Sequence, residues 1–233
     1  MTHSPIADLT PFTQLDYPGR LACIVWFSGC NMRCPYCHNP ELVPLRQGRI
    51  GIGELLEFLR RRSGLLDGVV LSGGEATLHD LAPLCREIVS LGYAVKLDTN
   101  GSRPDRLLAL VDEGLLDRVA LDFKAPASLF RSVTGGDSFD AFSQSLRGLM
   151  ERNISLEVRS TLHSRLHTPE TVRSMIRWLR RIGYRGPYIL QEARIPPEGT
   201  LVDLGPSSFD RGALGDTDGV QWRDAPPEAE TSR

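Results

Sequence analysis

Short apolar runs alternate with stretches of helical periodicity from about residue 20 to residue 191. In the first helical stretch the apolar positions recur at offsets of three, four and seven residues, at Ile52, Leu55, Leu56 and Leu59. The pattern predicts six strands, at residues 21–27, 69–71, 94–97, 119–123, 154–161 and 188–191. The helices expected between them cover residues 52–59, 81–91, 106–111, 139–152 and 170–182.

This alternation of strands and helices is typical of α/β folds built from parallel βαβ units. It is compatible with a doubly wound sheet or with a barrel, and six strands are too few for a complete eight-fold barrel. Polar residues follow the predicted strands at residues 72–75, 98–101, 122–124, 159–161 and 191–192. Parallel α/β folds build their sites at the carboxyl ends of the strands, so these segments form the candidate site.

The composition is typical of one globular domain, and the net charge does not indicate any particular type of binding partner. Of the 233 residues, 41% are hydrophobic, and 27 Lys and Arg nearly offset 29 Asp and Glu. This balance argues against nucleic acid or an anionic membrane as a partner. The chain has no leader-like N-terminus and no apolar run of about 18 residues, so neither export nor a membrane span is expected.

Residues 203–233 differ in composition from the domain predicted for residues 1–202, whose core runs from about residue 20 to residue 191. The C-terminal segment carries seven acidic and three basic residues, a net charge of −4 that leaves +2 on the rest of the chain. Because the segment is rich in Gly, Pro, Ser and Asp, we expect a mobile acidic tail in which Trp222 is exposed.

Three of the five cysteines fall within eight residues, directly after the first predicted strand. Cys30, Cys34 and Cys37 have the spacing C-x3-C-x2-C, which suits a disulfide with one free thiol, a zinc site completed by His38 or a remote residue, or an iron–sulfur cluster. Structural zinc usually takes two separated pairs of ligands, and the sequence has no second pair. A four-iron cluster held by three cysteines leaves one iron open to an exogenous ligand. The other two cysteines occupy apolar positions and are expected in the core: Cys23 and Cys85.

The cysteine motif resembles the signature of the radical S-adenosylmethionine superfamily, in which an aromatic residue, here Tyr36, precedes the last cysteine. Further segments are similar to the glycyl-radical-enzyme activases, and closest to the activating proteins of anaerobic ribonucleoside-triphosphate reductase: residues 16–19, 28–40, 72–75, 98–101 and 121–124. Ala76 departs from that family, which more often has proline after Gly-Gly-Glu. The resemblance covers nearly the whole chain and implies a partial (βα)6 barrel of the TIM type.

The resemblance also implies roles for the cysteines and for the residues at the strand ends. Cys30, Cys34 and Cys37 would hold one 4Fe-4S cluster, whose fourth iron binds S-adenosylmethionine. The residues expected to contact this cofactor are Tyr36, Gly73, Gly74, Glu75, Asp98, Thr99 and Asn100. A monovalent cation is expected beside the cofactor carboxylate, at Asp98, Thr99 and Asp122. The candidate catalytic residues are Asp122 and Lys124, with Lys124 contacting a carboxylate or orienting the substrate loop.

Most of these positions also have an ordinary structural interpretation. The glycines fit a turn, an Asp can cap the next helix, Lys124 can lie at the surface, and Tyr36 and Asn100 can close their own turns. Three histidines show no ligand spacing and are expected at the surface or as caps: His79, His163 and His167.

The function implied by the resemblance is reductive cleavage of S-adenosylmethionine and generation of a glycyl radical on anaerobic ribonucleoside-triphosphate reductase. An electron donor such as flavodoxin or ferredoxin would reduce the cluster, and the crowded thiols favour the cytoplasm. Three alternatives remain open: activation of another glycyl-radical enzyme of the pyruvate formate-lyase type, a radical reaction on a small molecule, and a structural zinc-binding module. No nucleic acid or membrane partner is expected.

Overall fold

The predicted parallel core is present, and the sheet is longer than predicted by one strand at each end. The computed structural model describes residues 4–195, 199–215, 217 and 219–223. Its sheet has eight strands in chain order: β1 (Ile6–Thr13), β2 (Ala22–Phe27), β3 (Gly68–Gly73), β4 (Ala94–Thr99), β5 (Arg118–Asp122), β6 (Ser155–Leu162), β7 (Tyr188–Glu192) and β8 (Val220–Trp222).

Seven of the strands run parallel, from β2 to β8, and the six predicted strands correspond to β2–β7. The first strand was not predicted, and it pairs antiparallel with β2, with Leu9 opposite Val25. In the part of the chain that the structure describes, β1 and β8 do not pair with each other, so the sheet stays open. The α/β class and the partial barrel are therefore confirmed.

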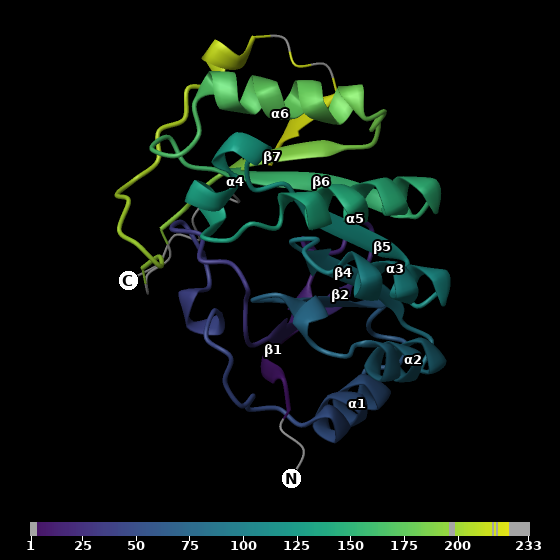
Figure 1. Cartoon of the computed structure of the whole chain (residues 1–233). Coiled ribbons are helices and arrows are strands. Elements are labelled where there is room, and N and C mark those ends of the chain that lie inside the picture. The colour runs from purple at the N-terminus through teal and green to yellow at the C-terminus, as the bar shows by residue number, and fades with distance from the viewer. Residues whose placement is uncertain (1–3, 196–198, 216, 218, 224–233) are drawn as a thin grey trace.

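The helices lie along the outer face of the curved sheet (Figure 1). They are α1 (Ile52–Arg61), α2 (Ala82–Ser90), α3 (Pro104–Asp112), α4 (Ala127–Thr134), α5 (Phe139–Glu151) and α6 (Pro169–Arg181). Short 3-10 turns follow the cysteine loop and β3 and precede β8: η1 (Pro40–Leu42), η2 (Ala76–Leu78) and η3 (Gly212–Leu214). None of the helices within the described ranges has the length and apolar character needed to cross a bilayer.

Alternate residues of each strand face the helices or the interior of the barrel. Outward residues such as Val25, Leu71 and Leu121 are fully buried beneath the helices and form the main core. Inward residues of β2 and β3, such as Ile24 and Val70, form a smaller apolar cluster. The apolar pattern thus explains both the helix layer and one half of the barrel interior.

The C-terminal segment packs on the open edge of β7. Residues of β8 continue the sheet, with Gln221 opposite Ile189. Trp222 is half-buried and its ring centroid lies 6.0 Å from that of the buried Phe209, so the prediction of an exposed Trp222 is wrong. These aromatic positions are too far apart in sequence to form a periodic pattern. Residues 216, 218 and 224–233 lie outside the described residues, and the expected mobile acidic tail stays a prediction there.

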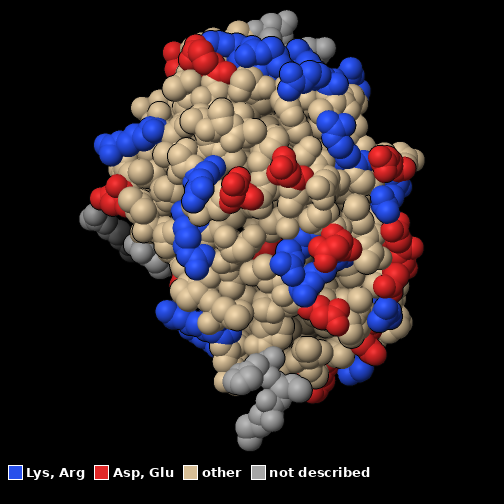
Figure 2. All heavy atoms as spheres, viewed as in Figure 1, with Lys and Arg blue, Asp and Glu red and all other residues tan. Residues whose placement is uncertain are grey.

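Charged side chains are distributed unevenly on the face that Figure 2 shows. Basic side chains gather along its upper edge, which is where α6 lies in Figure 1. Elsewhere on this face basic and acidic groups are interspersed. This agrees with the near balance of 27 basic and 29 acidic residues in the sequence.

Candidate functional site

The cysteine loop follows β2 and is held in place by backbone hydrogen bonds on both sides. Gly29 and Cys30 donate to the carbonyl oxygens of Leu42 and Val43 at 2.8 and 2.9 Å. On the other side the Arg33 amide donates to the carbonyl oxygen of Thr134 at 2.6 Å. The loop therefore has a defined path between η1 and α4.

Two glycines at the end of β3 let the chain pass close to the start of the cysteine loop. A Cβ atom on Gly74 would lie 2.2 Å from the carbonyl oxygen of Gly29, and one on Gly73 would lie 2.3 Å from the backbone nitrogen of Phe27. Gly73 also has a φ of 125°, which favours glycine. The Glu75 amide donates to Gly29 at 2.8 Å and completes the junction. These glycines are thus required by contacts within the chain, whatever they contribute to a ligand.

All five cysteines are free, and only three of them face the site. Cys23 and Cys85 lie fully buried in the main core, as predicted. Cys30, Cys34 and Cys37 line a cavity of about 720 Å³ at the carboxyl ends of the strands. Burial raises the pKa of all three thiols, that of Cys30 to about 11. A metal centre would therefore have to supply the positive charge that keeps them as thiolates.

The donor set fits a four-iron cluster with one open position. Three thiols line the cavity, and the remaining two cysteines are remote from it in the core. No group of three or more His, Cys, Asp or Glu side chains among the described residues is arranged around a single ion. Ligands of a cluster bind different irons, so a three-thiol wall suits a cluster better than mononuclear zinc.

Glu75 connects the ends of β3 and β4 beneath the cavity. Its side chain is 2% exposed, and Oε1 accepts from the Thr77 amide at 3.1 Å and from the Thr99 hydroxyl at 2.7 Å. Oε2 accepts from the Asn100 amide at 2.7 Å. Burial raises the pKa of Glu75, and these hydrogen bonds act in the opposite direction. The carboxylate is therefore held rigidly at the floor of the site.

Asp122 and Lys124 meet at the end of β5. The Lys124 ammonium lies 3.0 Å from Asp122 Oδ2, so Lys124 contacts a carboxylate rather than lying free at the surface. The Arg159 guanidinium of β6 contacts Asp122 Oδ1 through Nε at 3.1 Å. Burial alone would raise the pKa of Asp122, but the charges of Arg159 and Lys124 hold it at about 2. Asp122 is therefore ionised at any physiological pH.

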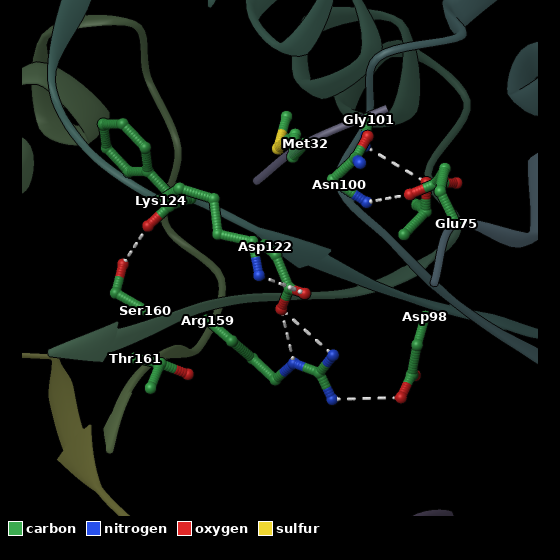
Figure 3. Close-up of polar contacts among 12 residues, drawn as sticks. Met32, Glu75, Asp98, Asn100, Gly101, Asp122, Lys124, Arg159, Ser160 and Thr161 are labelled. Atoms are coloured by element: carbon green, nitrogen blue, oxygen red, sulfur yellow. Dashed lines mark hydrogen bonds and ion pairs between the residues drawn. The ribbon is translucent and has the colours of Figure 1, made fainter. Parts of the chain in front are cut away.

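Asp98 of β4 also forms ion pairs with two basic side chains. Its Oδ1 pairs with the buried Lys96 ammonium, and its Oδ2 lies 3.3 Å from the Arg159 guanidinium (Figure 3). Lys96 and Lys124 are the only two lysines of the chain, and each pairs with one of the two carboxylates. The carboxylates predicted to bind a cation are thus bound to basic side chains.

Tyr36 and Asn100 lie on the cavity wall and also serve the local structure. The Asn100 carbonyl accepts from the Ser102 amide at 3.0 Å, which closes its turn, and its amide group donates to Asn31 of the cysteine loop at 3.0 Å. Tyr36 is buried, and its hydroxyl has no partner among the described atoms. This unpaired hydroxyl on a cavity wall fits a polar ligand group.

Two histidines that were expected at the surface or as caps are buried and bind loops around the site. His163 and His167 are 3% and 1% exposed. Nδ1 of His167 accepts from the His163 amide at 3.2 Å, so Nε2 carries the proton and donates to the carbonyl oxygen of Lys124 at 2.9 Å. His163 likewise donates from Nε2 to Gly205 at 3.0 Å. The pair ties the C-terminal segment to the loop after β5.

Every residue that was given a role in cofactor, metal or substrate binding from the resemblance lines the same cavity, although the individual roles stay predictions. These residues are Cys30, Cys34, Tyr36, Cys37, Gly73, Gly74, Glu75, Asp98, Thr99, Asn100, Asp122 and Lys124. Sequence reasoning included Arg159 only as part of a strand-end segment, gave Lys96 no role, and expected His167 at the surface or as a cap. Lys96 lies two residues before Asp98 on β4, so the alternation of strand faces could have found it. Arg159 lies opposite Asp122 on the neighbouring strand, and nothing local marks His167.

An open parallel sheet with a three-cysteine loop and a cavity at the strand ends is typical of a cofactor-binding α/β protein. The family model of the radical SAM superfamily matches residues 24–179, so the chain belongs to that superfamily. Its cofactors are accordingly a 4Fe-4S cluster and S-adenosylmethionine, and it is a radical S-adenosylmethionine enzyme.

Curated relatives resemble the chain over about half of its length. A Methanocaldococcus jannaschii protein with the provisional name glycyl-radical enzyme activating enzyme is 33% identical over 124 residues, 51% of this chain and 50% of the relative. The pyruvate formate-lyase-activating enzyme of Clostridium pasteurianum is 31% identical over 150 residues, 58% of this chain and 60% of the relative. The 7-carboxy-7-deazaguanine synthase of Methanopyrus kandleri is 32% identical over 164 residues, 61% of each chain. The chain therefore spans about half to three fifths of the length of these relatives.

Solved structures share the fold at low identity. Streptococcus suis SuiB has a TM-score of 0.63 and 12% identity over 84% of this chain and 47% of its own. Methylornithine synthase has a TM-score of 0.60 and 18% identity over 83% of this chain and 59% of its own. These similarities support the partial barrel alone.

Proposed function

We propose that this chain activates a glycyl-radical enzyme, and that its partner is anaerobic ribonucleoside-triphosphate reductase. The observation that carries the proposal is that three free thiols share one cavity of an open sheet with strand-end residues that include Glu75, Asp98 and Asp122. Relatives named for glycyl-radical enzyme activation support the class of reaction. The choice of the reductase rests on the sequence resemblance, and a partner of the pyruvate formate-lyase type is the alternative.

The chain's own residues would hold the cofactors and exclude water. Cys30, Cys34 and Cys37 would bind three irons, and Lys124 and Arg159 place positive charge where the cofactor carboxylate is expected. When bound, the cluster and S-adenosylmethionine supply reductive cleavage of the sulfonium C–S bond, and with it an acceptor for a hydrogen atom. A hydrogen atom would pass from the Cα of a partner glycine to that acceptor, and the unpaired electron would stay on the glycine Cα.

A small-molecule reaction is the second candidate function. The similarity to the 7-carboxy-7-deazaguanine synthase of Methanopyrus kandleri favours it, because that alignment covers 61% of each chain. The cavity wall also includes Arg194 and Arg223, which suit an anionic substrate. The two candidates differ in whether a second protein acquires the radical.

The electron donor is proposed to be a flavodoxin or a ferredoxin that docks beside the cysteine loop. Arg33, Arg46 and Arg49 are exposed in and after this loop and would favour an acidic partner. The reaction is proposed to take place in the cytoplasm, where thiols stay reduced.

The experiment that tests the partner is electron paramagnetic resonance on the reduced protein with S-adenosylmethionine and purified reductase. We expect a glycyl doublet on the reductase. The variant Cys34→Ala should abolish the doublet, and Cys85→Ala, which changes a core cysteine, is the matched control and should retain it. Cofactor cleavage without a doublet on the reductase, but with one on a formate-lyase-type enzyme, would reassign the partner.

Metal analysis of anaerobically purified protein tests the cluster itself. We expect about four irons and four sulfides per chain, as a 4Fe-4S cluster requires. Stoichiometric zinc without sulfide would instead support the structural zinc-binding module and contradict the proposed activity.

A further inference from the structure

Five charged side chains form a continuous line across β4, β5 and β6; four of them line the cavity, and the fifth, Lys96, is buried. Their order in space is Lys96, Asp98, Arg159, Asp122 and Lys124, with signs that alternate from one to the next. Arg159 lies at the centre and reaches both carboxylates, Asp122 at 3.0 Å and Asp98 at 3.3 Å. Figure 3 shows the guanidinium between the two acidic side chains.

The oxygens expected to bind a monovalent cation all have partners within the chain. Asp98 Oδ1 binds Lys96 and Oδ2 binds Arg159, while Asp122 Oδ1 binds Arg159 and Oδ2 binds Lys124. The Thr99 hydroxyl donates to Glu75 at 2.7 Å and accepts from the Gly101 amide at 3.1 Å. These residues therefore do not fit the expected cation, because no carboxylate oxygen lacks a basic partner.

The charges of this line also disfavour a further cation. Three basic groups outnumber two carboxylates, so the line carries a net charge of +1. The side chains of Arg159 and Asp98 are only 14% and 12% exposed, so water and salt screen them weakly. A like charge placed among them would be repelled, whereas an anionic ligand group would be attracted.

We propose that the Arg159 guanidinium replaces the monovalent cation at this site. It holds the two carboxylates together and leaves positive charge, shared with Lys124, for the carboxylate of S-adenosylmethionine. Cofactor binding in this protein is therefore independent of sodium and potassium. The inference rests on binding of S-adenosylmethionine in this cavity, as in the proposed function, but it requires no protein partner.

The test measures the affinity of the reconstituted protein for S-adenosylmethionine in choline chloride, sodium chloride and potassium chloride at one ionic strength. We expect the dissociation constant of the wild type to agree within twofold in the three salts. Arg159→Gln removes the guanidinium and should weaken binding about tenfold in choline chloride, the size expected for loss of a charge-assisted hydrogen bond. Potassium should then restore much of the lost affinity by binding between the two carboxylates.

Thallium-205 magnetic resonance reports the ion directly, without cofactor turnover. We expect no saturable thallium(I) binding to the wild type and one saturable site in Arg159→Gln. Arg159→Lys keeps a positive charge and should stay insensitive to potassium. Arg173→Gln is the matched control, because Arg173 is on α6 and pairs with Glu170 away from the cavity.

Several results would contradict the proposal that Arg159 replaces the monovalent cation. A saturable potassium requirement of the wild type, measured without any variant, would contradict it outright. Wild-type affinity of Arg159→Gln in choline chloride would contradict it too, as would weakened binding that potassium does not restore. Because only cofactor and ion binding are measured, failure to find a glycyl doublet on a partner leaves this result unaffected.

Discussion

Replacement of Gly74 by alanine is the sharpest test of how β3 positions the cysteine loop. The added Cβ would lie 2.2 Å from the carbonyl oxygen of Gly29 and 2.8 Å from that of Leu42. Both contacts are with backbone, so no flexible side chain can move aside, and the two segments must separate by about 1 Å to reach ordinary contact. The φ of Gly74 is not positive, so the cost comes from these contacts and not from backbone strain.

The magnitude follows from the hydrogen bonds at this junction. Separation would break or lengthen three of them: Gly74 to Phe27 at 2.9 Å, Glu75 to Gly29 at 2.8 Å and Gly29 to Leu42 at 2.8 Å. At roughly 0.5–1.5 kcal/mol each, the loss of all three lowers the free energy of unfolding by about 1.5–4.5 kcal/mol. Cys30 follows this junction directly, so iron content after anaerobic reconstitution should fall as well.

The assay combines urea unfolding with iron and sulfide analysis. Gly53→Ala is the matched control, because Gly53 is exposed on α1 with no atom within 4 Å of the added Cβ. Alanine there should stabilise the protein by about 0.4–1 kcal/mol and leave the iron content unchanged. A Gly74→Ala protein with the wild-type urea midpoint and the wild-type iron content would refute the argument from close contact.

Three further predictions concern the charged line, the buried histidines and the C-terminal segment. Asp122→Asn should lower the free energy of unfolding by about 3 kcal/mol at pH 7. Because the pKa of Asp122 in the folded protein is about 2, the difference from the wild type in urea unfolding should persist above about pH 4 and shrink as the pH falls toward 2. A difference that stays constant over this range would contradict the ion pairing of Asp122. Burial lowers the pKa of His167, so the stability that the neutral imidazole contributes is complete above about pH 6.5 and is lost as the pH falls. His167→Gln should therefore flatten the dependence of the free energy of unfolding on pH between 7 and 5. Val202→Pro removes the amide that donates to Pro35 of the cysteine loop at 3.1 Å and should speed iron release to a chelator several-fold, whereas Val202→Ala keeps that amide and should match the wild type.

The strands that sequence reasoning found each contain a short run in which apolar residues predominate. β2, β3, β4, β5 and β7 are buried for most of their length, and β6 at half of its positions, so these strands have a strong local signal. β1 was not predicted because Pro11 and polar residues interrupt its apolar pattern, as is common in an edge strand. β8 is only three residues long, and it forms because the edge of β7 is available, which no local pattern encodes.

The residues of the site were predictable because the topology gathers them, and their pairings were not. Parallel strands bring their carboxyl ends to one edge, so polar residues at those ends share a cavity whatever their chemistry. Which side chains bind each other depends on register between strands. Asp122 lies directly opposite Arg159 in the ladder of β5 and β6, and that register is set by packing over the whole strands.

The charged half of the barrel interior is better explained by function than by stability. Besides the line through Asp98, Arg159 and Asp122, the interior holds Glu157, which is 1% exposed and paired with Arg118 at 2.9 Å. Buried ion pairs often contribute less than apolar residues of similar size, because desolvation offsets the Coulomb attraction. The β2 and β3 side of the same interior is apolar, so the fold itself accommodates a hydrophobic filling there. Asp98, Asp122 and Arg159 line the cavity, whereas Glu157 and Arg118 do not. The charges of β4, β5 and β6 that reach the cavity are therefore placed to bind an ionic cofactor.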